Sequence, residues 1–487
     1  MIIEFRVQNF LSVKDEQVLN FEADKTDKKY RDYFVVNAGQ YNLLKILGIY
    51  GPNASGKTNI LDALQAFRSI LGPQGLYAFA SPVFFAADPA YNAGHSKFSL
   101  DFLVSNSGNY VKYTYTVVFN SAAKKIISEK LVYFPKRREA LIFERTLNEE
   151  EERGFTLKVP KSINLKNADS EAMKANTMNH MLVLSCFSKL NLLFPQAKDA
   201  FVWFQSVLPS INPRTSVKSA KKWYDESPEG KKLLLQFLKQ ADLNISDIHI
   251  KKMDEDIANE ILNFITVTKD NVREESVREE VVREMQFAEY DLKNNMMRKD
   301  ELKFTNYDIY LMHTSVTNEN KEVTYSLPLL TESSGTQRLF DLAYPLLLSF
   351  IYPSVITIDE IESSLHLEIV KYFILTYLSN SQESQIVFTT HNLFLLEWDI
   401  LRNDTVWFTN KEKDGTTALT PMTSFNGINR QKILKQYLAG AFDALPNPRH
   451  FKFDCDALIE EEIQSGRRTE RGRRTEQGRR TEQGRRC

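Results

Sequence analysis

The sequence predicts an α/β fold in which a strand-rich lobe and a mostly parallel sheet flanked by helices are interrupted by a helical insertion. Three observations lead to this prediction. A glycine-rich loop follows the mostly apolar run 43–50 and precedes the helical pattern 59–71. The runs 97–104 and 110–119 alternate at roughly period two, which is typical of antiparallel strands. Further along, 355–358 is a short β-branched run, as expected of a buried strand.

Composition excludes several classes of protein. The 487 residues carry 62 Lys and Arg against 63 Asp and Glu, for a formal net charge of -1. No overall field therefore attracts nucleic acid or a membrane surface. Three widely spaced cysteines, Cys186, Cys455 and Cys487, fit neither a disulfide framework nor a zinc site, and they predict a reducing, cytoplasmic location.

No membrane segment is predicted. Residues 342–358 carry no charge over 17 positions, but they include Pro345 and Pro353. Because a span needs ~20 apolar residues, we expect a buried helix followed by a buried strand. The N-terminal run 1–7 alternates like a strand and lacks the features of a signal peptide.

At 487 residues the chain is expected to form two or more lobes, because single cores stop growing near ~250–300 residues. The order of patterns divides it into four segments. We expect residues 1–160 to form the first half of the α/β head with the glycine-rich loop, 161–301 a mainly helical insertion, and 302–450 the second half. The extension 451–487 follows.

The end of the extension differs in kind. From residue 466 it repeats a Gly-Arg-Arg-Thr-Glu unit, with nine arginines and three glutamates and hence a local net charge of +6. Such a segment is too polar to fold. Two interpretations stay open: it holds an acidic partner or nucleic acid by counterion release, or it is the read-through of a short DNA repeat with no essential role.

The glycine-rich loop has the complete pattern of a phosphate-binding P-loop. Its residues are Gly51, Pro52, Asn53, Ala54, Ser55, Gly56, Lys57 and Thr58. The glycines let backbone N–H groups and the next helix N-terminus point at a phosphate chain. Lys57 would add a charge at the β- and γ-phosphates, and the Thr58 hydroxyl is the expected Mg²⁺ ligand. The loop therefore predicts ATP and Mg²⁺ as cofactors; the alternative is a glycine turn that matches by chance.

A second set of chemical groups lies in residues 331–391. A Ser-Ser-Gly turn with Ser333 and Gly335 precedes a helical pattern, which is either an anion site or a plain helix cap. The strand 355–358 then ends in Asp359 and Glu360. Asp359 is suited to the Mg²⁺ shell and Glu360 to activate a water, whereas solvated turn residues are the alternative.

A third strand, 385–390, delivers His391 at its carboxyl end, where open α/β sheets bind ligands. A single histidine after a strand is usually structural. In this order of motifs we expect His391 to contact the γ-phosphate, and we assign the catalytic roles to Glu360 and His391.

The order of these motifs resembles the ABC-type ATPase heads of the SMC, RecF and OLD families. Closer still is the resemblance to the RloA/AbiL-type bacterial AAA-family ATPases. It spans residues 1 to about 450 and is carried by four motifs, at 9–12, 332–337, 359–366 and 437–446.

The resemblance implies that Ser333 and Gly335 form a signature that acts across a homodimer held together by ATP. It implies that Ser364 to His366 are the D-loop equivalent and that His391 is the switch histidine. The usual Leu-Ser-Gly-Gly-Gln signature is altered here to Glu332 through Thr336, and Gln74 only weakly matches a Q-loop glutamine. The implied function is the ATPase and sensor subunit of an anti-phage defence system with a separately encoded nuclease or toxin.

Two other functions stay open at this point. A DNA repair or chromosome-maintenance clamp would need a basic groove, and only the short cluster 136–138 is rich in Lys and Arg, so nucleic acid stays open as a partner. An OLD-like nuclease would need an appended metal-binding domain. Asp454 and Asp456, followed by 460–462, hint at one, but only about 70 residues separate His391 from Glu462, too few for a domain of ~100 residues.

Overall fold

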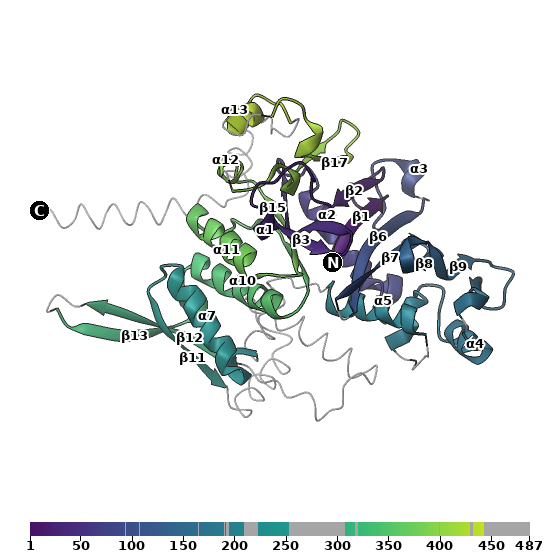
Figure 1. Cartoon of the computed structure of the whole chain (residues 1–487), viewed down its shortest axis with the longest axis horizontal. Coiled ribbons are helices and arrows are strands. Elements are labelled where there is room, and N and C mark those ends of the chain that lie inside the picture. The colour runs from purple at the N-terminus through teal and green to yellow at the C-terminus, as the bar shows by residue number, and fades with distance from the viewer. Residues whose placement is uncertain are drawn as a thin grey trace, which may run out of the picture. The chain divides into compact units, whose positions relative to one another are not determined.

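Figure 1 shows the structure of the chain, a computed structural model whose described residues all fall within Met1–Leu445. The described residues are 1–92, 94–106, 108–163, 165–188, 190, 194–208, 223–252, 307–316, 320–398, 400–428 and 432–442. The charged run 270–301, the pair Asp454 and Asp456, and the repeat from residue 466 lie outside them.

Seven antiparallel strands form one sheet, in the order β10-β9-β8-β7-β6-β1-β2. They are β1 (Ile2–Gln8), β2 (Gln17–Asn20), β6 (Ser96–Asn106), β7 (Asn109–Asn120), β8 (Lys125–Tyr133), β9 (Ala140–Leu147) and β10 (Phe155–Lys158). The predicted strands 97–104 and 110–119 are confirmed and pair with each other as β6 and β7. Phe98 and Tyr115 of this sheet contact Phe67 of helix α2 (Lys57–Ser69), so one sheet face is buried against that helix.

The second sheet is mostly parallel, with the order β14-β15-β5-β16-β17. Its strands are β5 (Ile46–Tyr50), β14 (Val355–Ile358), β15 (Gln385–Thr390), β16 (Val406–Lys411) and β17 (Thr417–Pro421). Only β17 is antiparallel to its neighbour. Every residue of β5, β14 and β15 is buried, because helices and the first sheet cover a parallel sheet on both faces. The predicted α/β class is therefore confirmed.

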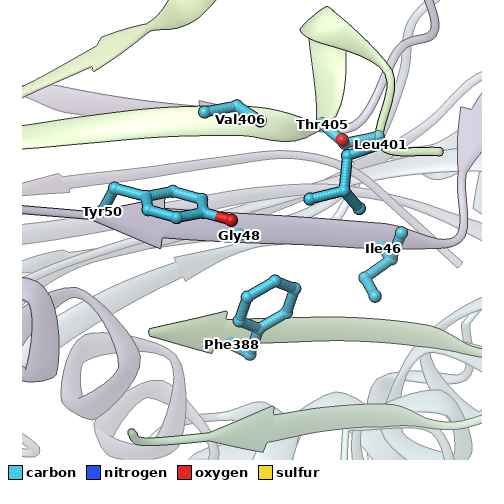
Figure 2. Close-up of a pocket in the computed structure, with 7 residues that line it drawn as sticks. All are labelled: Ile46, Gly48, Tyr50, Phe388, Leu401, Thr405 and Val406. Atoms are coloured by element: carbon cyan, nitrogen blue, oxygen red, sulfur yellow. The ribbon is translucent and has the colours of Figure 1, made fainter. Parts of the chain in front are cut away.

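Close packing between β5 and β15 requires a glycine. Figure 2 shows the ring of Phe388 beside Gly48, within a small pocket that Ile46, Leu401 and Val406 also line. A Cβ at position 48 would lie 2.6 Å from Cζ of Phe388. This mostly apolar pocket lies in the body of the sheet and belongs to its packing, whereas the polar candidate residues gather at the sheet edge.

The longer helices are α4 (Asn167–Ala175), α5 (Pro195–Ser206), α7 (Pro228–Gln240), α10 (Ser334–Ile351) and α11 (Leu367–Asn380). The apolar run 342–358 comprises the mostly buried second half of helix α10 and then the buried strand β14, so the predicted order of helix and strand is confirmed. In the part of the chain that the structure describes, no helix combines the length and apolar character that a membrane crossing requires. The short elements are α1 (Arg31–Phe34), β3 (Val35–Ala38), β4 (Tyr41–Leu44), α3 (Pro89–Asn92), α12 (Phe394–Glu397) and α13 (Ile433–Leu438).

Within the predicted helical insertion the structure also contains a strand. β11 (Ile245–Lys252) pairs with β12 (Tyr307–Val316), which pairs with β13 (Glu322–Pro328) in an antiparallel three-stranded sheet. Helix α7 packs against both β11 and α10 (Figure 1). The strand partner of β11 comes more than fifty residues later in the chain, so local pattern did not reveal it. The boundaries of the four predicted segments stay predictions.

Candidate nucleotide-binding site

The glycine-rich loop joins the buried strand β5 to helix α2. Ala54 and Gly56 both adopt left-handed backbone conformations, with φ of 62° and 98°. A side chain on Gly56 would collide with the hydroxyl of Thr417, and one on Gly51 would collide with Thr409. The loop therefore has the tight turn that places the α2 N-terminus, with its free N–H groups, at the end of the strand.

A chain of hydroxyl groups supports this loop from behind. Thr417 Oγ1 donates to the carbonyl oxygen of Ser55 at 2.9 Å, so it must accept from Ser12 Oγ, 2.7 Å away. Asn59 Nδ2 donates to Ser12 Oγ at 2.6 Å. Ser55 Oγ lies 2.6 Å from Thr409 Oγ1. Three distant segments thus fix the loop conformation.

Lys57 is the buried cation of the loop, with 5% of its surface exposed. Its Nζ donates to the carbonyl oxygens of Gly51 at 2.9 Å and Pro52 at 3.0 Å, and lies 3.3 Å from Nδ1 of His391. Burial lowers the pKa of Lys57, while the nearby carboxylates act to raise it. An anion bound at the loop would place negative charge next to this desolvated ammonium and so stabilise its charged form.

Thr58 and Asp359 lie together although 301 positions separate them. Thr58 Oγ1 donates to Asp359 Oδ2 at 3.0 Å, and Thr389 Oγ1 donates to Asp359 Oδ1 at 2.5 Å. The strands β5, β14 and β15 are parallel, so their carboxyl ends meet at one sheet edge. The hydroxyl and carboxylate oxygens are ligands that Mg²⁺ prefers.

Glu360 and His391 face each other at the same edge, with 3.6 Å between Glu360 Oε1 and His391 Nε2. Glu360 has a left-handed backbone with φ of 48°, and its N–H donates to Thr389 Oγ1 at 2.8 Å. The side chain of Glu360 is 55% exposed, so it can reach a water or a ligand. The His391 N–H donates to Glu362 Oε1 at 2.5 Å, which fixes the position of the histidine.

The turn that begins α10 contains the predicted signature residues Ser333 and Gly335. Ser333 caps the helix by accepting from the Thr336 N–H at 3.1 Å. Gly335 packs so closely on the Ser364 carbonyl that a Cβ would lie 2.8 Å from its oxygen. Among the hydrogen bonds of the described residues, none joins Ser333 or Gly335 to residues 51–58. Ser333 is exposed, and it is free to face another molecule.

Arg338, one turn into α10, links this helix to the carboxylate pair. Its Nη2 donates to the carbonyl oxygens of Asp359 at 3.0 Å and Glu360 at 3.3 Å. These two hydrogen bonds hold the first turn of α10 against the end of β14.

The residues of this site lie within a region that matches a known protein family. One model, described as "AAA domain, putative AbiEii toxin, Type IV TA system", matches residues 46–177 and 190–397, which is more than half of the chain. The chain belongs to this AAA-domain family. The match contains every candidate residue named above from the P-loop to His391.

Solved structures with similarity to this AAA-domain chain include three SMC heads. The SMC head domain from Thermotoga maritima is 13% identical, with a TM-score of 0.37 over 86% of this chain and 98% of that chain. An SMC head bound to the C-winged helix domain of ScpA is 12% identical, with a TM-score of 0.38 over 86% and 96%. A head with an extended coiled coil from Pyrococcus furiosus is 14% identical, with a TM-score of 0.33 over 90% and 99%. No curated protein matches the chain.

The candidate site of this AAA-domain protein carries an excess of negative charge. Burial raises the pKa of Asp62 on α2, and the charge of Asp359 raises it further. In the described part of the chain no cluster of three or more His, Cys, Asp or Glu side chains could hold a metal alone. The oxygen atoms of Thr58 and Asp359 fit Mg²⁺ that shares its ligands with phosphate oxygens, which is its usual mode at such sites.

Sequence reasoning missed several residues that shape the site. Thr389 holds both Asp359 and the Glu360 N–H, and Thr409 and Thr417 support the P-loop. A threonine directly after three apolar residues of a strand was the available signal for Thr389 and Thr409. Gln74 lies in the turn before a short 3-10 helix, and among the described residues its side chain makes no hydrogen bond to the site.

Proposed function

We propose that this chain binds and hydrolyses ATP with Mg²⁺. The observation that carries the proposal is the convergence of Lys57, Thr58, Asp359, Glu360 and His391 at the carboxyl edge of one parallel sheet. Five polar groups from three strand ends, with a helix N-terminus beside them, match the needs of a phosphate chain and its metal ion.

Each residue has one proposed role. The loop N–H groups and Lys57 bind the β- and γ-phosphates, and the binding of this polyanion offsets the desolvation of the ammonium. Thr58 and Asp359 would hold Mg²⁺, which neutralises charge on the phosphates when it is bound. Glu360 is the general base that orients and deprotonates the attacking water. His391, held by Glu362 and adjacent to Lys57, contacts the γ-phosphate.

A complete site needs a second copy of the chain. The proposed signature residues Ser333 and Gly335 make no hydrogen bond to their own P-loop among the described residues, while Ser333 lies exposed at a helix N-terminus. In a homodimer each signature would face the γ-phosphate on its partner, and hydrolysis would release the two heads.

Ser333→Arg is expected to abolish hydrolysis while each protomer still binds ATP, because the long cation blocks the signature and leaves the P-loop unchanged. Mixed with Lys57→Ala protomers, it should regain partial activity, since one site of each mixed dimer combines two wild-type halves. Steady-state ATP hydrolysis after subunit exchange measures this. No recovery, with mixed dimers demonstrated by differently tagged protomers, would contradict action across the dimer.

We propose further that the chain is the ATPase and sensor subunit of a bacterial anti-phage defence system of the RloA/AbiL type. Two findings support this role: the family description refers to an AbiEii toxin and a toxin–antitoxin system, and the four motifs at 9–12, 332–337, 359–366 and 437–446 resemble RloA/AbiL-type proteins. No second catalytic constellation is present among the described residues, so the effector is a separately encoded nuclease or toxin.

The purified protein is therefore expected to hydrolyse ATP and to leave DNA and RNA intact in Mg²⁺ or Mn²⁺, because the proposed nuclease or toxin is a separate protein. Gel analysis of labelled DNA and RNA after incubation provides the measurement, with Glu360→Gln as the control for contaminating activity. Metal-dependent cleavage that disappears in Asp454→Ala would replace this role by that of an OLD-like nuclease.

A further inference from the structure

A buried histidine and glutamate connect the three-stranded sheet to the signature turn. His313 lies on β12, and Glu332 directly precedes Ser333. His313 Nε2 and Glu332 Oε1 are 2.7 Å apart, and the two side chains are only 8% and 7% exposed. The ring of Tyr325 on β13 stacks on the imidazole, with centroids 5.4 Å apart and planes 22° apart. The imidazole is thus fixed by ring stacking on one face and by hydrogen bonds at both of its nitrogen atoms.

The partners of His313 define where its protons lie. Its Nδ1 is 3.1 Å from the carbonyl oxygen of Asn244, which can only accept, so Nδ1 must donate. The contact between Nε2 and Glu332 therefore contains one more proton, which the ring and the carboxylate share. At 2.7 Å between two buried side chains this hydrogen bond is short, and it fixes the orientation of the Glu332 side chain.

Glu332 is held from both sides. Its side chain is bound by His313, and its carbonyl oxygen accepts from Gln337 Nε2 at 2.9 Å. The next residue, Ser333, caps α10 through the Thr336 N–H. Because Glu332 is fixed, the orientation of the Ser333 hydroxyl and of the first N–H groups of α10 is fixed as well.

We propose that His313 is a positioning residue for the signature turn, and that its hydrogen bond to Glu332 orients Ser333 for the nucleotide on the partner protomer. This inference rests on the proposed function, because it requires a signature that acts across a homodimer. His313 itself contacts neither the P-loop nor the carboxylate pair among the hydrogen bonds of the described residues. Its effect on hydrolysis would pass through Glu332.

The test is complementation between protomers. His313→Ala is expected to lower kcat for ATP hydrolysis ~10–100-fold, the effect of losing one buried hydrogen bond that positions a reacting group, with ATP binding by each protomer unchanged. Mixed with Lys57→Ala protomers, it should regain activity, because the wild-type P-loop of one chain then meets the wild-type signature of the other. Mixed with Ser333→Arg protomers it should not, because both signatures are then defective.

Three further variants test the contact and distinguish its loss from a general loss of stability. Glu332→Ala should lower the rate of ATP hydrolysis as much as His313→Ala does. The double variant should lower it no further, because both substitutions remove the same contact. Glu332→Gln should keep near wild-type activity, since its amide N–H can donate to Nε2 while Nδ1 still donates to Asn244. The matched control is His249→Ala, a 59% exposed histidine on the neighbouring strand β11, which should leave hydrolysis unchanged.

Opposite results would overturn the inference. These are wild-type hydrolysis by His313→Ala, recovery with Ser333→Arg but not with Lys57→Ala, additive losses in the double variant, or equal losses in Glu332→Gln and Glu332→Ala. The reference mixture of Lys57→Ala and Ser333→Arg distinguishes a failure of the composite site from a failure of the role of His313. If that mixture recovers, a failure concerns His313 alone; if it does not, the composite site is overturned and the inference with it.

Discussion

Lys57→Ala is expected to abolish measurable ATP binding. Lys57 is the buried cation of the P-loop, and its Nζ already lies against two loop carbonyl oxygens and His391. Removing one partner of a buried charge pair costs about 2–5 kcal/mol, which corresponds to a loss of affinity of ~30-fold or more. Titration calorimetry with ATP and Mg²⁺ measures the effect.

The control for this variant is Lys125→Ala, because Lys125 is an exposed lysine paired with Glu149 and distant from the site in the chain. It should bind ATP as the wild type does. Circular dichroism and thermal unfolding should show that Lys57→Ala stays folded. Normal ATP affinity in a folded Lys57→Ala protein would remove the assignment of residues 51–58 as the nucleotide site.

Glu360→Gln is expected to bind ATP normally and to lower the rate of hydrolysis by ~10²–10⁴, the usual contribution of general acid–base catalysis. The amide has the shape of the carboxylate but cannot accept the proton of the attacking water. Because ATP then persists, dimers should accumulate when ATP is added. Single-turnover hydrolysis and light scattering with and without ATP measure the two effects.

The matched control is Glu368→Gln on α11, where the carboxylate is 67% exposed and paired with Lys371. It should hydrolyse ATP at the wild-type rate. Near wild-type hydrolysis by Glu360→Gln would exclude Glu360 as the base. In that case Glu362, whose Oε1 accepts the His391 N–H, would be the next carboxylate to test.

The strand and helix patterns predicted most of the head because its elements are short and strongly periodic. The alternation in 97–104 and 110–119 predicted β6 and β7, and the apolar run 342–358 predicted a helix and then β14. β11 escaped prediction because its hydrogen-bonding partner, β12, follows after residues 253–306. Strand pairing over such a distance depends on the folded chain and leaves no local signal.

The sequence by itself determined the chemical groups of the candidate site and their order along the chain. The P-loop from Gly51 to Thr58, the pair Asp359 and Glu360, and His391 each follow an apolar strand, and local chemistry is enough to identify such motifs. Parallel strands also have their carboxyl ends at one edge, so the convergence of these motifs followed once a parallel sheet was predicted.

Only the tertiary structure decided what supports those groups. Ser12 and Thr417, 405 residues apart, form one hydrogen-bond chain behind the P-loop. Thr389 holds Asp359, and His313 holds Glu332 beside the signature. A serine, threonine or histidine can make many alternative hydrogen bonds, so its partner is selected by the packing of distant segments. That packing exists only in the folded chain, and for this physical reason the sequence identified the candidate groups of the site but not the residues that hold them in place.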